Sequence, residues 1–138
     1  MRQVLFYSIG GNTRKLAEII AEEMGVKAAD IRAASVGPAA EIIFLGSGCY
    51  GSRPGESMMK FIEKNDFSGR KVAVFGTSGG NVGIEVDSMT AALKRKGATV
   101  LGAITAKAKA FLLFNQDRPN QEDLAGSRKF AKEIVKLG

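Results

Sequence analysis

The amino-acid sequence predicts an α/β protein whose parallel β-sheet is covered by helices on both faces. Short apolar runs alternate along the chain with segments whose apolar residues recur at helical spacing. The runs at 41–46 and 71–76 are almost continuously apolar, as expected of strands that are buried on both faces. Because such alternation favours right-handed crossover connections, the strands should be parallel.

The first third of the chain predicts a strand, a helix and a second strand. After the first apolar run, a helix is expected over residues 13–24, with Gly25 as its left-handed end. Residues 27–31 are alanine-rich and weakly apolar, and we expect them to form an edge strand. Residues 32–40 are too few for a substantial crossover helix. The first helix should bury Leu16, Ile19, Ile20 and Met24.

The middle of the chain repeats a strand-loop-helix pattern. We expect a central strand at 41–46, and further strands at 71–76 and 99–106. The helix before 71–76 should bury Met58, Phe61 and Ile62, and the helix after it should bury Val86, Met89 and Leu93 and end at Gly97.

The last part of the chain predicts one more helix. Residues 111–114 form an apolar patch that could be part of a split strand, a lid or a contact surface. Asn120 and Asp123 have the spacing of a capping box at the start of the helix. Its apolar side chains, expected to face inward, are Leu124, Phe130, Ile134 and Leu137.

Length and composition limit the possible classes of protein. The 138 residues suit one domain, which should bury about two thirds of its unfolded surface. The chain has no His and one Cys, so metal sites held by the protein, an internal disulfide, and Ser-His or Cys-His catalysis are not expected. No apolar run reaches membrane-spanning length and a strand begins almost at the N-terminus, which favours a cytoplasmic protein.

The net charge of +6 allows a nucleic-acid surface, an acidic protein partner or simple solubility. Residues 94–96 are cations at the expected end of a helix, where they complement the helix dipole. Aromatic residues do not interleave with the cations, as a stacking surface for single strands requires. We therefore do not expect nucleic-acid binding.

A glycine turn between the first strand and the first helix predicts an anion site. Residues 8–13 face the start of the helix, where backbone N–H groups have no internal partners and the dipole places roughly +0.5 charge. A phosphate supplies both acceptors and countercharge, although a tight turn holding water or sulfate has the same sequence pattern. Glycine-rich loops also follow the strands at 41–46 and 71–76, so all three can converge on one crevice.

These loops resemble those of flavodoxins. The segment Ser8-Ile9-Gly10-Gly11-Asn12-Thr13 matches the family's phosphate loop, roughly Thr/Ser-x-Thr-Gly-x-Thr, except that Gly10 replaces a threonine. The similarity continues in Gly-Ser-x-x-Tyr-Gly-Ser-x-Pro-Gly-Glu at 46–56 and Phe-Gly-Thr-Ser-Gly-Gly at 75–80, and is greatest to compact flavodoxins of anaerobic bacteria and archaea. It implies a doubly wound, five-stranded parallel sheet in the order 2-1-3-4-5.

The resemblance also implies a function and a set of site residues. The implied function is that of an FMN-binding electron carrier, with Tyr50 as the candidate stacking partner of the isoalloxazine and Gly51-Ser52 as the pair whose peptide flips on reduction. Tyr50 could instead pack over its loop, and Cys49 could be a reactive thiol or a small buried residue. The implied cofactor-binding residues are Ser8, Ile9, Gly10, Gly11, Asn12 and Thr13, then Ser47, Gly48, Cys49, Tyr50, Gly51 and Ser52, and then Thr77, Ser78, Gly79, Gly80 and Asn81.

Redox proteins are the partners that this resemblance implies, and the positive charge of the chain favours acidic, ferredoxin-like donors or acceptors. Two other functions remain open. One is an NAD(P)H-dependent flavin or quinone reductase, although no pattern of a catalytic acid, base or nucleophile is present. The other is a binding module without flavin, suggested by Gly10 and by the absence of a second aromatic residue near Gly80-Asn81.

Overall fold

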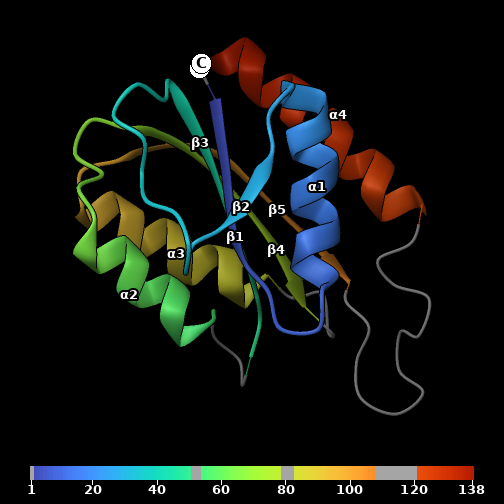
Figure 1. Ribbon diagram of the computed structural model, residues 1–138, viewed down its shortest axis with the longest axis horizontal. Coiled ribbons are helices and arrows are strands. Elements are labelled where there is room, and N and C mark those ends of the chain that lie inside the picture. The colour runs from blue at the N-terminus through green and yellow to red at the C-terminus, as the bar shows by residue number, and fades with distance from the viewer. Residues whose placement is uncertain (1, 51–53, 79–82, 108–120) are drawn as a thin grey trace.

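The computed structural model describes residues 2–50, 54–78, 83–107 and 121–138. These residues form a five-stranded sheet in the order β2-β1-β3-β4-β5, with every strand parallel to its neighbours (Figure 1). The predicted fold class and strand order are therefore confirmed. In chain order the elements are β1 (Arg2–Tyr7), α1 (Asn12–Met24), β2 (Ala28–Asp30), β3 (Ile42–Gly48), α2 (Glu56–Lys64), β4 (Lys71–Ser78), α3 (Ile84–Arg95), β5 (Thr99–Lys107) and α4 (Gln121–Leu137).

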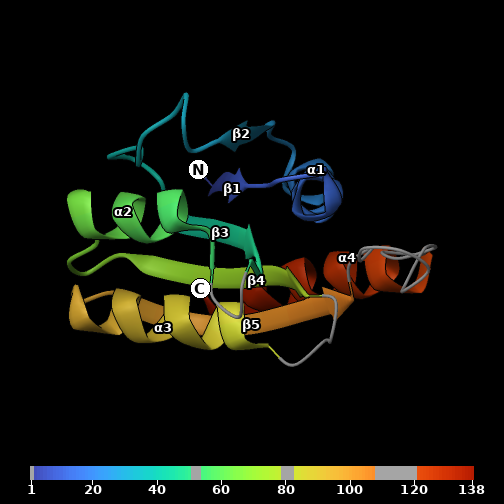
Figure 2. The same cartoon turned by 90° about the horizontal axis from the view of Figure 1, so that it is seen from below.

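Helices cover both faces of the sheet. Figure 2, which looks at the edge where the strands end, shows α2 and α3 on one side and α1 and α4 on the other. Alternate residues of the central strands face the two layers, so Leu45 and Val74 belong to the core under α2 and α3, and Phe44 and Phe75 to the other core. Every residue of β3 is buried, as predicted for a central strand.

The connection from β2 to β3 has no helix, as the sequence predicted, and polar side chains hold it in place. The Gln3 side chain donates to the Ser35 carbonyl at 2.9 Å and accepts from the Gly37 N–H at 2.9 Å. The Arg70 guanidinium donates to the carbonyls of Gly37 and Ala40 at 2.6 and 3.0 Å. These bonds satisfy backbone groups that no helix or strand pairs.

Helix α1 differs in detail from the prediction. Its Leu16 and Ile20 are buried as predicted, whereas Ile19 and Met24 are only half-buried. Small residues, Ala17 and Ala21, complete the buried stripe of this helix. Gly25, with φ of 70°, ends α1 as predicted.

The predicted inward position of Leu137 in α4 is wrong, because 65% of this residue is exposed. The inward stripe of α4 runs through Ser127, Ala131 and Ile134. At 100° per residue Leu137 points well to one side of that stripe. Leu124 and Phe130 are partly buried against the core, and Ile134 is fully packed into it.

Two predicted features lie outside the described residues: the apolar patch at 111–114 and the cap at Asn120. Among the helices that the structure describes, none is long and apolar enough to cross a membrane.

Packing at two glycines predicts opposite effects on stability. A Cβ at Gly46 in β3 would lie 2.1 Å from the buried Phe75 ring, whereas a Cβ at Gly126 in α4 would meet nothing within 4 Å. We expect Gly46→Ala to lower the free energy of unfolding by about 1–3 kcal/mol through overpacking. Gly126→Ala, the matched control, should raise it by about 0.5–1 kcal/mol because alanine is the better helix former. Chemical denaturation measures both, and equal effects would contradict the packing argument.

Candidate phosphate and ring-binding site

The turn from β1 into α1 depends on two glycines with left-handed backbones. The φ angles of Gly10 and Gly11 are 82° and 88°, a region in which a β-branched residue is strongly disfavoured. Glycine adopts this backbone freely, unlike the threonine that the family's loop has at the position of Gly10. A Cβ at either glycine would meet no described atom within 4 Å, so the outer side of this loop has room for a ligand.

The start of α1 is built to attract an anion. Its N-cap is Gly11, which has no side chain to accept hydrogen bonds from the first turn. Of the four described helices, α1 alone has no acidic residue in its first turn. The Ser8 hydroxyl beside this turn is buried and lies close enough to the Tyr50 hydroxyl to interact with it. The first backbone N–H groups of a helix have no partner inside the helix, and such donors suit a phosphate group.

The three predicted loops converge at one edge of the sheet. The hydroxyls of Thr13 and Thr77 are hydrogen-bonded at 2.8 Å, which joins the start of α1 to the end of β4. The Cys49 N–H donates to the Thr77 carbonyl at 2.8 Å and so adds the end of β3. This edge lies between β1 and β3, where the strand order reverses, and ligands of open α/β sheets bind there.

We call residues 8–13, between β1 and the first turn of α1, the phosphate loop. A pocket of about 460 Å³ opens beside it. Two aromatic rings contribute to it, Tyr7 and Tyr50, which meet edge to face with their centroids 6.1 Å apart. This volume falls within the range of small-molecule sites. The lining residues are Tyr7, Ile9, Tyr50, Pro54, Gly55 and Glu56.

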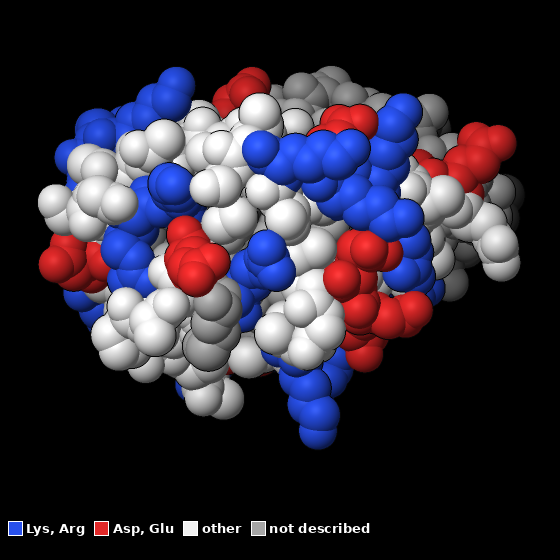
Figure 3. Space-filling view, turned by 90° about the horizontal axis from the view of Figure 1, so that it is seen from above, with Lys and Arg blue, Asp and Glu red and all other residues white. Residues whose placement is uncertain are grey.

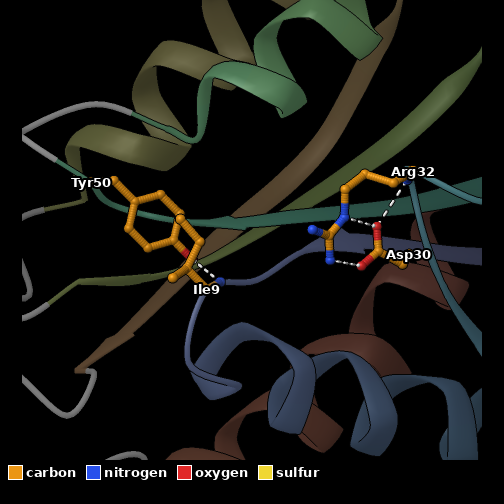
Figure 4. Close-up of polar contacts among 4 residues, drawn as sticks. All are labelled: Ile9, Asp30, Arg32 and Tyr50. Atoms are coloured by element: carbon orange, nitrogen blue, oxygen red, sulfur yellow. Dashed lines mark hydrogen bonds and ion pairs between the residues drawn. The ribbon is translucent and has the colours of Figure 1, made fainter.

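The hydroxyl of Tyr50 reaches out of this pocket into the phosphate loop. The Ile9 N–H donates to the Tyr50 hydroxyl oxygen at 2.7 Å (Figure 4). Burial raises the pKa of the Tyr50 phenol, and the Ile9 N–H and the hydroxyls of Thr13 and Ser8 oppose that rise only in part. The ring lies against Gly48, where a Cβ would be 2.4 Å from the phenol oxygen. Gly48 is therefore needed for this orientation of Tyr50.

Other predicted site residues are used inside the protein. The Ser47 hydroxyl is fully buried, donates to the Gly48 carbonyl at 2.9 Å and accepts from the Gly55 N–H at 3.0 Å. Ser78 is buried as the last residue of β4. Five predicted residues lie outside the described part of the chain, namely Gly51, Ser52, Gly79, Gly80 and Asn81.

The sequence analysis did not single out Tyr7 and Arg32. Tyr7 ends β1 immediately before the phosphate loop, and the Arg32 guanidinium lies 5.3 Å from the centre of its ring. Asp30 fixes Arg32 with two hydrogen bonds to the guanidinium, at 2.6 and 3.0 Å (Figure 4). The bonded Arg32 side chain lowers the pKa of the Asp30 carboxyl. An aromatic residue at the end of the first strand was the available signal for Tyr7.

Glu85 is a buried acid that the sequence analysis also missed. It is fully buried in the first turn of α3 and lies over Gly76, where a Cβ would be 2.6 Å from its Cγ. The Thr105 hydroxyl donates to Oε1, and Oε2 has no partner among the described residues. Burial raises the pKa of the Glu85 carboxyl, against the opposing effect of the Thr105 hydroxyl.

The strand order β2-β1-β3-β4-β5, together with a helix start that attracts anions and an aromatic pocket where the strand order reverses, is that of a flavodoxin-like α/β protein. The comparison with known families agrees, because the family model described as "Flavodoxin domain" matches residues 3–120. The chain belongs to the flavodoxin family.

Individual relatives extend this comparison. An uncharacterized protein of Methanocaldococcus jannaschii is 29% identical over an alignment of 136 positions that covers 91% of each chain. A flavodoxin from the domain Archaea has a similar structure, with a TM-score of 0.80, 22% identity and coverage of 99% of this chain and 98% of that one. Oxidised flavodoxin 1 from Bacillus cereus gives a TM-score of 0.78 at 23% identity, covering 98% and 97% of the two chains.

The buried Glu85 predicts a particular dependence of stability on pH. Below the ordinary glutamate pKa of 4.5, the carboxyl is neutral in the folded and the unfolded protein and has no ionisation cost. As pH rises from there through the raised folded pKa, the unfolded protein ionises first, so wild-type stability falls. Glutamine keeps an acceptor for Thr105 and cannot ionise. We expect Glu85→Gln to become more stable than wild type across this window, measured by denaturation at several pH values.

The exposed Glu18 on α1 provides the control for this prediction. Glu18→Gln removes an exposed carboxyl and leaves the buried Glu85 in place. The free energy of unfolding of this variant, relative to wild type, should not rise across the same pH window. A Glu85→Gln effect that is independent of pH would show that ionisation of Glu85 is not responsible.

Proposed function

We propose that this protein binds FMN and transfers electrons between redox proteins. The observation that carries the proposal is the start of α1, which has a glycine cap, no acidic residue in its first turn and the buried Ser8 hydroxyl beside it, next to an aromatic pocket. A bound flavin accepts and donates electrons reversibly, and the protein holds it and adjusts its potential.

The phosphate of FMN has enough donors in the loop without a cationic side chain. We assign it to the Ile9 N–H, the Ser8 hydroxyl and the backbone N–H groups at the start of α1. The helix dipole adds favourable electrostatics at the same place. Gly10 and Gly11 leave their outer side open to the ligand.

The ring of the flavin is assigned to the adjacent pocket. Tyr7 and Tyr50 offer aromatic surfaces there, and Ile9, which is 58% exposed, adds apolar area at the border of the phosphate loop. Aromatic faces favour stacking against a flat ligand by about 0.5–1.5 kcal/mol beyond burial. Arg32 lies above Tyr7 at the border of this pocket and is held there by its ion pair with Asp30.

Charge supports acidic redox proteins as the partners. The chain carries 20 Lys and Arg against 14 Asp and Glu. Figure 3 shows the face where the strands begin, opposite the candidate site, and there cations are spread among acidic groups and do not form one continuous basic surface. The net excess of cations over the whole chain fits weak, long-range attraction of an acidic protein.

Removal of the Ser8 hydroxyl tests the phosphate assignment. A hydrogen bond to a charged group contributes about 1.5–3 kcal/mol, so Ser8→Ala should weaken FMN binding by about 10–100-fold. Riboflavin, which has no phosphate, should bind wild type and variant alike. Quenching of flavin fluorescence measures both ligands. Ser57→Ala, on α2 outside the pocket lining, is the control and should leave both affinities unchanged.

The outcome also decides the function. Failure of wild type to bind FMN would reject the proposal. Equal weakening of FMN and riboflavin by Ser8→Ala would move the contact of Ser8 from the phosphate to another part of the ligand.

The dependence of electron transfer on salt tests the choice of partner. With an acidic ferredoxin as the probe, the bimolecular rate constant for the FMN-loaded protein should fall as ionic strength rises, because salt screens attraction beyond about 10 Å at 0.1 M. Stopped-flow mixing at several salt concentrations measures this rate. A rate constant that does not change with salt would contradict attraction by charge.

A further inference from the structure

The position of Tyr50 has a consequence for how a phosphate enters the loop. Its hydroxyl accepts the Ile9 N–H at 2.7 Å, and its ring meets Tyr7 edge to face. The ring also fills the space that Gly48 leaves by having no side chain. Contacts at both ends of the side chain therefore hold the phenol inside the phosphate loop.

The phenol uses a donor that a bound phosphate also needs. A backbone N–H has one hydrogen to donate, so the Tyr50 oxygen and a phosphate oxygen compete for Ile9. A phosphate dianion forms the stronger, charge-assisted bond, and the start of α1 favours its charge. The neutral phenol is the weaker competitor and can be displaced.

We infer that Tyr50 is an internal competitor for the phosphate loop, whose hydroxyl occupies the Ile9 N–H until a phosphate group enters and displaces it. The inference rests on the proposed function in that the same loop holds the phosphate of the ligand. The apparent affinity for phosphate is then reduced in proportion to the fraction of molecules in which the loop is open. Entry of phosphate also frees the Tyr50 ring from the loop, which links the two halves of the binding site.

Inorganic phosphate tests the inference without any flavin. Tyr50→Phe keeps the ring and removes the competing oxygen, so this variant should bind phosphate about 2–10-fold more tightly than wild type, the factor that corresponds to one neutral hydrogen bond. Titration calorimetry at constant ionic strength measures the affinity. Ser57→Ala is the matched loss of a hydroxyl elsewhere and should bind phosphate as wild type does.

A second variant removes the competitor by a different route. Gly48→Ala places a Cβ within 2.4 Å of the phenol oxygen and within 2.6 Å of Cζ, and the nearest atoms that it meets all belong to Tyr50. The added methyl group should push Tyr50 out of the loop and so also tighten phosphate binding. Agreement between the two variants would separate loss of competition from any direct effect of the hydroxyl.

The movement of Tyr50 can be observed directly, because the chain has two tyrosines and no tryptophan. With labelled tyrosine rings, nuclear magnetic resonance should show the Tyr50 signals shifting with phosphate and saturating at the calorimetric Kd. Equal or weaker phosphate binding by Tyr50→Phe, absence of phosphate binding in wild type and both variants, or binding without a shift of Tyr50 would each overturn the inference. If it fails while Ser8→Ala still weakens FMN binding selectively, the proposed function stands.

Discussion

The start of α1, whose first backbone N–H groups have no partner inside the helix, is the constraint around which this edge of the molecule is arranged. The glycine cap supplies no acceptor, and carboxylates are missing from the first turn, although α2, α3 and α4 all have them. Donors without a partner inside the helix bond to water, to side chains or to a ligand. One of the loop's donors, the Ile9 N–H, finds its acceptor in the Tyr50 hydroxyl, which comes from a loop 41 positions further along the chain.

The sheet makes that contact possible by bringing the loops after β1, β3 and β4 to one edge. Continuous apolar strands, small residues in α1 and glycines at close approaches keep the layers tight. Gly46 leaves room for Phe75, and Gly76 leaves room for Glu85. In the same way, the absence of a side chain at Gly48 leaves room for the Tyr50 ring. The same strands therefore determine both the packing of the core and the shape of the site.

Most of the fold was predictable from the sequence, because buried parallel strands read as apolar runs and Gly25 marks the end of α1. The order of the strands was not in those runs. It came from the resemblance of three loops, since hydrophobicity does not encode which strands are neighbours. The phase of a helix was equally uncertain, because the apolar periodicity of α4 placed Leu137 on the inner stripe, whereas the structure leaves 65% of this residue exposed.

The arrangement of the candidate site could be predicted only in part from its residue types. Loop positions were predicted, and Ser8, Ile9, Thr13, Tyr50 and Thr77 do lie together, but side-chain directions depend on tertiary contacts. At position 10 the chain has a glycine with a φ of 82° and so lacks the hydroxyl of the family's threonine. On the proposed function, a phosphate in this loop uses backbone donors and the Ser8 hydroxyl, and replaces the phenol that already holds one of these donors. The affinity of the loop for its ligand then depends on how much more strongly the ligand binds the Ile9 N–H than the Tyr50 hydroxyl does. The strength of the Tyr50 contact therefore affects this affinity as much as the loop itself does.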